Sequence, residues 1–240
     1  MINIEGISKS FKDTKVLNDV SFEIEKGDFT AVMGASGSGK STLLYSVSGM
    51  DNISAGQVIF EGVNISELRE RELSRFRLTK MGFVFQNAQM LKNLSIYDNI
   101  ILPGLVAKKE LPEKIRKRAS ELMGRMEISG IENRDIKEVS GGQLQRASIC
   151  RAMINKPDIL FLDEPTGALN SEATEQVLEI LEELNNEGMT IMIVTHDPRV
   201  AAKAKKVLYI RDGQIAASKD LRNGSGSEFE LGNWLKEVHL

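Results

Sequence analysis

The chain has 240 residues, of which 41% are hydrophobic and 27% charged, and its formal net charge is −3. This composition is typical of a globular domain, and the small negative charge gives no support to a nucleic-acid-binding function. Its single cysteine excludes an intrachain disulfide and fits a reducing cytosol.

The start of the chain, residues 1–5, lacks the basic and apolar regions of a signal peptide. No apolar run approaches the ~20 residues that a membrane span requires. If the protein acts at a membrane, we therefore expect another chain to supply the spans. Apolar residues alternate with polar ones over residues 2–4 and 20–24, a period typical of half-exposed antiparallel strands.

Residues 34–41 fit the phosphate-loop pattern G-x-x-x-x-G-K-[ST], between an apolar run at 29–33 and a predicted helix that opens at Ser41. Glycines let successive N–H groups face one concavity, where the helix dipole attracts an anion. We expect Lys40 to reach the β- and γ-phosphates of a nucleoside triphosphate and the Ser41 hydroxyl to ligate Mg²⁺. The predicted nucleotide-binding residues here are Gly34, Ala35, Ser36, Gly37, Ser38, Gly39, Lys40, Ser41 and Thr42. The alternative is a Gly-rich turn that matches by accident, and the flanking strand and helix disfavour it.

Beyond the phosphate loop, residues 56–62 predict a strand between glycines. Ser66 is predicted to cap a charged helix that runs to about Lys80. Residues 81–85 then predict a buried strand that ends at Gln86.

From Asn87 to about Asn155 the pattern is mainly helical, with Pro112 suited to a first helical position. We interpret this stretch as an inserted helical subdomain. The basic run at 114–118 favours a solvated helix face over a binding patch.

The second half of the chain predicts a fully apolar strand at 159–162 that precedes Asp163 and Glu164. A helix from about Ser171 to Glu187 precedes another apolar strand at 190–194. Further on, Asp212-Gly213 predicts a hairpin turn, residues 222–227 a flexible linker, and the last residues a short helix docked on this or a neighbouring subunit.

Polar residues follow four of the apolar strands, which are separated by helices. Such strands favour a parallel sheet buried on both faces, whose carboxyl ends share one edge. We therefore expect Asp163 to hold Mg²⁺ and Glu164 to polarise the attacking water. Gln86 and His196 are predicted catalytic groups near the γ-phosphate, with Gln86 also a predicted metal ligand. The alternatives are an acidic pair that starts a helix and a structural histidine.

The tetrapeptide Ser140-Gly141-Gly142-Gln143 precedes a helical run and predicts a second anion-binding helix N-terminus. One nucleotide should not need two such sites from one chain, so we expect this one to face the nucleotide of another copy. We assign Ser140, Gly142 and Gln143 to nucleotide binding. An ordinary Ser-capped helix is the alternative.

These motifs stand in the order found in ATP-binding-cassette ATPases, which the chain resembles from Ile2 to about Ile215. The resemblance implies an α/β fold with a P-loop NTPase (RecA-like) core and an antiparallel β-subdomain, over 1–86 and 156–220. It also implies a helical subdomain over about 87–155, with a linker and short helix at 221–240. A head-to-tail homodimer would enclose two ATP molecules with Mg²⁺, and Phe11 would stack on adenine.

Three segments (82–86, 163–169 and 194–198) are similar to the MacB/LolD/BceA-like cassettes. That likeness implies a peripheral protein at the cytoplasmic face of the plasma membrane, which drives a separate permease that exports peptides, antibiotics or lipoproteins. The segment 91–102 would receive the coupling helix of that permease. Two departures from the family pattern are Val139, where leucine is usual, and Asn170, where aspartate is usual.

Two other functions compete with transport. The same ATPase chemistry would serve a mechanotransmitting or peptide-sensing cassette that signals without moving a substrate. A soluble cassette of DNA repair or translation usually carries two cassettes or a long coiled-coil insertion, and the sequence has neither.

Overall fold

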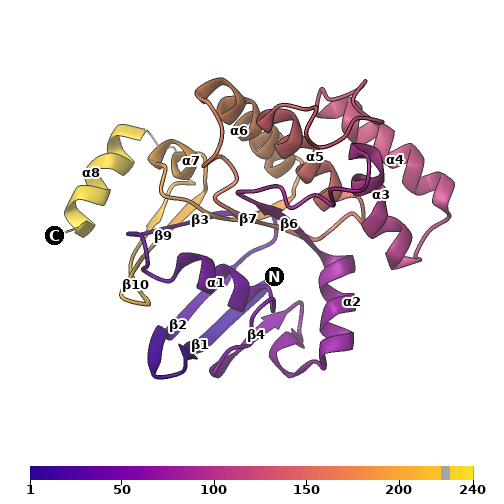
Figure 1. Ribbon diagram of the computed structural model, residues 1–240. Coiled ribbons are helices and arrows are strands. Elements are labelled where there is room, and N and C mark those ends of the chain that lie inside the picture. Colours follow the sequence, from indigo (N-terminus) through magenta and orange to yellow (C-terminus); the bar gives the residue numbers. More distant parts are fainter. Residues whose placement is uncertain (223–227, 240) are drawn as a thin grey trace. The chain divides into compact units, whose positions relative to one another are not determined.

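The computed structural model describes residues 1–222 and 228–239 and divides into two compact units (Figure 1). The first unit comprises Met1–Leu73 and Asn185–Leu240, and the second comprises Ser74–Leu184. The boundaries fall inside two helices, α2 (Glu70–Lys80) and α6 (Ser171–Asn186). Of the predicted linker at 222–227, all but the first residue lies outside the described residues.

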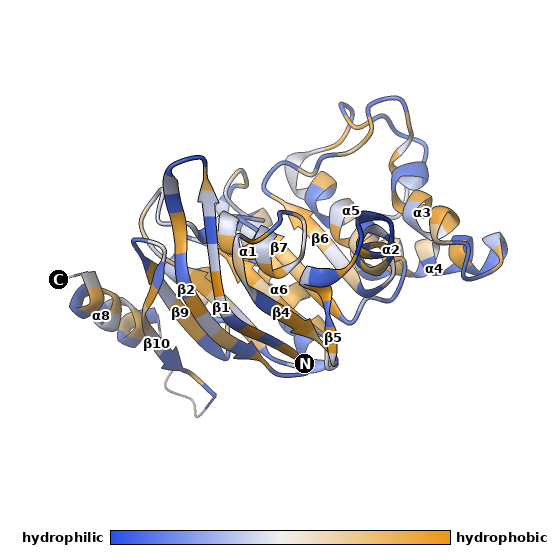
Figure 2. Ribbon diagram, turned by 90° about the horizontal axis from the view of Figure 1, so that it is seen from below, coloured by the Kyte–Doolittle hydropathy of each residue, from blue (hydrophilic) through white to orange (hydrophobic). Residues whose placement is uncertain are grey.

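An antiparallel sheet in the first unit contains the alternating segments at the start of the chain. Its strands run in the order β2-β1-β4-β5. They are β1 (Ile2–Phe11), β2 (Thr14–Ile24), β4 (Ala55–Phe60) and β5 (Val63–Asn64). Blue and orange residues alternate along β1 and β2 in Figure 2, as expected where one face is buried and the other is wet. The prediction of antiparallel strands is confirmed.

The first unit also contains a group of strands in the order β10-β9-β3-β8. They are β3 (Phe29–Met33), β8 (Thr190–Val194), β9 (Lys206–Arg211) and β10 (Gln214–Asp220). Strand β3 pairs in parallel with both β8 and β9, and all residues of β3 and β8 are buried. Burial on both faces explains why all their residues except Thr30 and Thr190 are apolar. The predicted hairpin is confirmed, because Asp212 (φ 50°) and Gly213 (φ 73°) form the turn between β9 and β10.

Among its described residues, the first unit also contains three α-helices and one 3₁₀ turn besides its parts of α2 and α6. They are α1 (Lys40–Val47), the 3₁₀ turn η1 (Ile65–Glu67), α7 (Pro198–Ala202) and α8 (Glu228–His239). Helix α8 packs against α7, and its last turn accepts a hydrogen bond from Arg211 Nη1 at Val238 O, 3.3 Å long.

The second unit combines two parallel strands, β6 (Met81–Phe85) and β7 (Ile159–Asp163), with most of α6 and with three helices that pack on one another. The helices are α3 (Ile96–Ala107), α4 (Pro112–Arg125) and α5 (Gly141–Met153). Pro112 begins α4, as predicted, because a first helical residue needs no N–H donor. Among the described residues, no helix has both the length and the apolar character needed to cross a membrane.

The predicted role of Ser66 as the cap of a long charged helix is wrong. Helix α2 begins only at Glu70, and Ser66 lies inside η1, which the Asn64 side chain caps by accepting the Ser66 N–H. The Ser66 hydroxyl instead accepts the N–H of Val58 at 2.9 Å. The sequence pattern assigned the Ser66 hydroxyl oxygen to a helix N-terminus, but it bonds to Val58 of strand β4.

Cys150 provides a test of packing in the second unit. Its side chain is fully buried in α5, and burial raises the pKa of the thiol to about 12. Because only the thiolate reacts readily, we expect Ellman's reagent to leave the native protein unmodified. The same reagent should modify one thiol per chain in concentrated guanidinium chloride. Equal labelling rates in the two conditions would contradict the buried placement of Cys150.

Candidate nucleotide-binding and catalytic residues

The phosphate loop lies in the first unit between the buried strand β3 and helix α1. Gly39 precedes the first turn of α1 with φ of 101°, a conformation that favours glycine. Lys40 Nζ donates to the carbonyl oxygens of Gly34 and Ala35 at 2.9 and 2.8 Å, so the ammonium group folds back over the loop. The Ser38 hydroxyl oxygen is buried and has no hydrogen-bond partner within the described residues. A buried polar atom without a partner, next to a helix N-terminus and a lysine, fits a bound phosphate group.

His196 follows the neighbouring strand β8. Val32 pairs with Val194, and the Thr195 N–H donates to Val32 O at 3.1 Å, so His196 and the phosphate loop leave the sheet at the same edge. The histidine is exposed, and Asp197 after it caps α7. Hydrogen bonds from Arg199 hold the pKa of Asp197 below its usual range. Within the first unit, the strand pairing therefore places His196 and the phosphate loop at the same edge of the sheet.

Phe11 also belongs to this region of the first unit. It ends β1 and pairs with Thr14, the first residue of β2. A side chain at Gly39 would come within 3.1 Å of Val16 O, so β2 passes directly beside the phosphate loop. The phenyl ring is 48% exposed, which leaves it open to a ligand.

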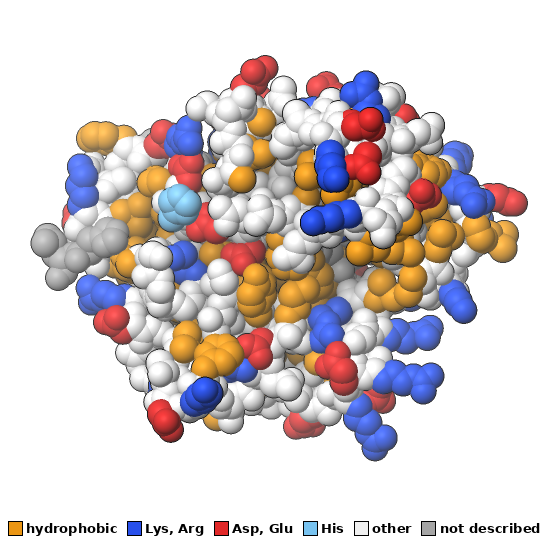
Figure 3. All heavy atoms as spheres, in the orientation of Figure 1, with side chains coloured by type: hydrophobic (Ala, Val, Ile, Leu, Met, Phe, Trp, Pro, Cys, Tyr) orange, Lys and Arg blue, Asp and Glu red, His pale blue; other side chains and the backbone are white. Residues whose placement is uncertain are grey.

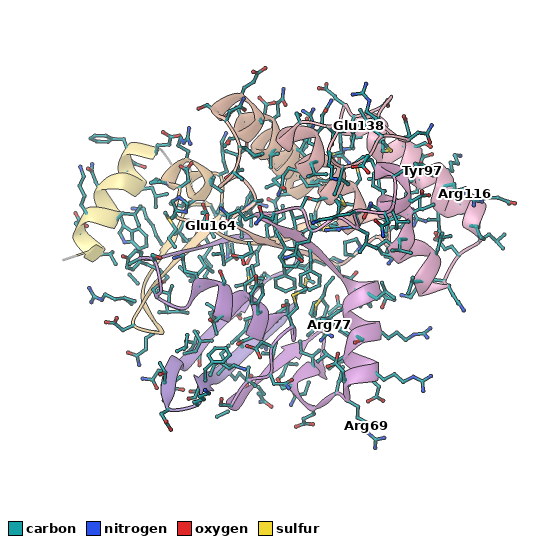
Figure 4. The ribbon with its side chains drawn as sticks, viewed as in Figure 1. Arg69, Arg77, Tyr97, Arg116, Glu138 and Glu164 are labelled. Atoms are coloured by element: carbon teal, nitrogen blue, oxygen red, sulfur yellow. The ribbon has the colours of Figure 1, made fainter. Side chains whose placement is uncertain are left out.

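The predicted carboxylates lie in the second unit with Gln86. Phe85 and Asp163 are partners in the β6–β7 pairing, so Gln86 and Glu164 follow the two strands at the same edge. Asp163 is buried, and Glu164, labelled in Figure 4, has a φ of 48° in the left-handed region. Non-glycine residues seldom adopt that region, and strained residues cluster at functional sites.

The Gln86 side chain lies against the segment that follows these carboxylates. A Cβ added at Gly167 would come within 2.8 Å of Gln86 Nε2. Gln145 of α5, itself buried, donates to the Phe85 carbonyl at 3.1 Å and so fixes the end of β6. The structure brings Gln86, Asp163 and Glu164 together within the second unit.

The tetrapeptide at 140–143 forms the first turn of α5. The Ser140 hydroxyl accepts the Gln143 N–H, and Gln143 Oε1 accepts the Ser140 N–H, at 3.2 and 3.0 Å. This reciprocal pair is a capping box, so the structure contains the ordinary helix cap that the sequence left open. Gly142 packs so closely on α6 that a Cβ there would lie 2.9 Å from the Cβ of Ala173. Asn170 Oδ1 accepts the Ala173 N–H at 2.9 Å, so this unusual residue caps α6.

Two polar side chains that the sequence patterns missed, the half-buried Arg151 and the buried Asn99, hold the segment after Gln86. Arg151 of α5 donates to the carbonyl oxygens of Ala88 and Gln89 at 2.7 and 2.8 Å, and its burial lowers the pKa of the guanidinium. Asn99 of α3 both donates to and accepts from the backbone of Leu91. Their partners are distant or non-helical backbone groups, so no local pattern indicates either role.

The described residues contain no cluster of three or more His, Cys, Asp or Glu side chains that could hold a metal ion.

A phosphate loop between a buried parallel strand and a helix defines a P-loop nucleotide-binding protein. Residues 17–167 match the family described as ABC transporter, and the chain belongs to this family. It is an ATP-binding-cassette ATPase with the α/β fold of that class.

Two relatives and one solved structure illustrate the likeness. The macrolide export ATP-binding/permease protein MacB of Campylobacter jejuni is 43% identical over 215 residues, which are 90% of this chain and 33% of that protein. The bacitracin export ATP-binding protein BceA of Halalkalibacterium halodurans is 43% identical over 205 residues, 84% of this chain and 79% of that protein. A dimeric ATP-binding cassette in a post-hydrolysis state, bound to ADP and Pi, has a TM-score of 0.86 at 34% identity and covers 92% of this chain and 99% of its own. The chain spans about a third of the MacB relatives, and the likeness to MacB and BceA confirms the predicted subgroup.

Proposed function

We propose that this chain is the ATP-hydrolysing subunit of an exporter, which dimerises on ATP and drives a separate membrane permease. The observation that carries the proposal is the phosphate loop, with its folded-back Lys40 and the buried Ser38 hydroxyl that lacks a partner. The protein would act at the cytoplasmic face of the plasma membrane on peptides, antibiotics or lipoproteins. Export by the relatives MacB and BceA supports this substrate class.

The chemistry that we assign to the residues follows from phosphoryl transfer, in which proteins mainly position groups and stabilise charge. Lys40 would leave the carbonyl oxygens of its own loop for the β- and γ-phosphates, and Ser41, Gln86 and Asp163 would hold Mg²⁺, which neutralises phosphate charge when bound. Glu164 would accept a proton from the attacking water. His196 would donate a hydrogen bond to the γ-phosphate.

A second copy of the chain would complete each nucleotide site. Ser140, Gly142 and Gln143 stand at the first turn of α5, where the Ser140 and Gln143 N–H groups bond within the capping box and the Gly142 N–H has no partner inside the helix. We propose that these three residues bind the γ-phosphate of ATP held by the other copy, in a head-to-tail homodimer. The similar cassette that was solved as a dimer with ADP and Pi supports dimerisation. We also propose that the helical subdomain extends from about residue 87 to residue 155.

The permease would bind the segment 91–102 of the second unit. Leu91 (53% exposed) begins that segment, and Val106 and Leu111 are further exposed apolar residues. Orange side chains gather over α3 and α4 in Figure 3. Hydrogen bonds hold this segment in place. Asn99 donates to the carbonyl oxygen of Leu91, and the Tyr97 hydroxyl donates to Arg116 O at 3.2 Å. Tyr97 and Arg116 are labelled in Figure 4. An ordered apolar surface of this kind is typical of a binding site for another protein.

Cross-linking tests the permease contact. The native Cys150 is buried, so a cysteine introduced in Leu91→Cys would be the reactive thiol. We expect this variant, co-expressed with its partner permease, to form a cross-link to that permease with a short bifunctional reagent. The matched control is Lys117→Cys on the exposed face of α4, whose native side chain is 81% exposed. Equal cross-linking of the two variants, or none with Leu91→Cys in any nucleotide state, would contradict the proposed contact.

A further inference from the structure

Lys9 occupies an inward position of an otherwise apolar strand face in the first unit. Ile2, Ile4 and Ile7 of β1 are buried on this face, and Lys9 continues it with only 7% of its surface exposed. A buried ammonium group is costly unless it is paired and hydrogen-bonded. A lysine at this position therefore needs a structural or functional reason.

The Lys9 ammonium contacts three groups among the described residues of the first unit. Nζ lies 2.6 Å from Asp51 Oδ1 and 2.5 Å from the carbonyl oxygen of Asn52. It also lies over the Phe11 ring, 4.7 Å from the ring centroid. That distance is within the roughly 6 Å at which a cation and an aromatic face attract each other.

These contacts connect the phosphate-loop helix to the aromatic residue. Asp51 follows the end of α1, where its N–H donates to Tyr45 O at 3.1 Å. Lys9 is therefore fixed by the segment that leaves α1. Through Lys9, that segment fixes the side of Phe11 that faces the ammonium group. The ring remains 48% exposed, so a flat ligand can stack on its other side.

We infer that Lys9 is a positioning residue for the nucleotide base. It holds the Phe11 ring in the orientation in which the exposed side can stack on adenine. This inference rests on the proposed role of Phe11. A ring that is already oriented loses less conformational freedom when the base binds, so the ammonium group strengthens ATP binding without touching ATP.

The test compares ATP with inorganic tripolyphosphate, which has the phosphates but no base. Lys9→Met keeps the length of the side chain and removes its charge, and Lys9→Arg keeps the charge. By calorimetry, we expect Lys9→Met to raise the Kd for ATP about two- to fivefold, the range for a lost cation–π contact. The Kd for tripolyphosphate should stay the same, and Lys9→Arg should bind ATP as the native protein does.

Phe11→Leu separates this inference from the function on which it rests. If Phe11 stacks on adenine, Phe11→Leu weakens ATP binding, and adding Lys9→Met to it has no further effect. An unchanged ATP affinity in Phe11→Leu overturns the role of Phe11 itself. Three results would overturn the role of Lys9 alone, given that Phe11→Leu weakens ATP binding. Lys9→Met could leave the affinity for ATP unchanged, or it could weaken the binding of ATP and tripolyphosphate equally. It could also weaken ATP binding by the same factor in the double variant as in the single one. If Lys9→Met does not fold, Asp51→Asn replaces it, because this substitution weakens the contact that holds the Lys9 ammonium group. Its affinity is measured for both ligands, and an unchanged affinity for ATP then overturns the inference.

Discussion

We expect the substitution Glu164→Gln to lower the steady-state rate of ATP hydrolysis by at least about a hundredfold, the usual contribution of a positioned general base. Glutamine keeps the shape of the side chain but cannot accept a proton from water. The φ of 48° at position 164 is unchanged by this substitution, so the fold should be retained. ATP binding should persist, and the ATP-bound dimer should accumulate because ATP is no longer hydrolysed and the dimer does not dissociate. Phosphate release measures turnover, and size-exclusion chromatography with ATP measures dimerisation.

Glu172→Gln is the matched control for this experiment. Glu172 is also a glutamate, but it is exposed in the first turn of α6. Its substitution should leave turnover within about twofold of the native rate, since exposed substitutions seldom have large effects. Normal turnover in Glu164→Gln would show that another group activates the water.

The substitution Lys40→Met should raise the Kd for ATP by at least about tenfold, since a hydrogen bond to a charged group contributes about 1.5–3 kcal/mol. Lys40 donates to the carbonyl oxygens of Gly34 and Ala35 in the structure, so its ammonium group is already in the phosphate loop. Methionine retains the aliphatic length and removes all donors. Calorimetric titration with ATP measures the loss.

Lys26→Met provides the control, because Lys26 is an exposed lysine in the turn between β2 and β3. It should bind ATP as the native protein does. Melting temperatures of both variants show whether a loss of affinity comes from unfolding of the loop. An unchanged ATP affinity in Lys40→Met would remove Lys40 from the nucleotide site.

The sequence patterns predicted the strands and the phosphate loop because these depend on local information. Strands β3 and β8 are buried on both faces, so all their residues except Thr30 and Thr190 are apolar, and this apolar character marks them in the sequence. The hairpin at Asp212-Gly213 was predictable for a similar reason, because two adjacent positive φ angles favour these residue types.

Side chains that bond to distant backbone were not predictable in the same way. The Ser66 hydroxyl accepts a hydrogen bond from Val58 in strand β4. A local capping pattern contains no information about this more distant donor. Arg151 and Lys9 are charged residues whose hydrogen-bond partners lie far away along the chain, 62 and 63 positions for Arg151 and 42 and 43 positions for Lys9. Lys9 did have one signal, a charge at an inward position of an apolar alternation, but the alternation alone does not identify Asp51 or Phe11 as its partners.

The packing of α8 against α7 has a practical consequence for watching the ATPase work. Trp234 of α8 is the only tryptophan in the chain and is half-buried. Helix α7 begins with its cap at Asp197, the residue after His196. Intrinsic fluorescence therefore offers a native, dye-free reporter on the part of the first unit where α7 follows His196, and it would respond to changes in the solvent around Trp234.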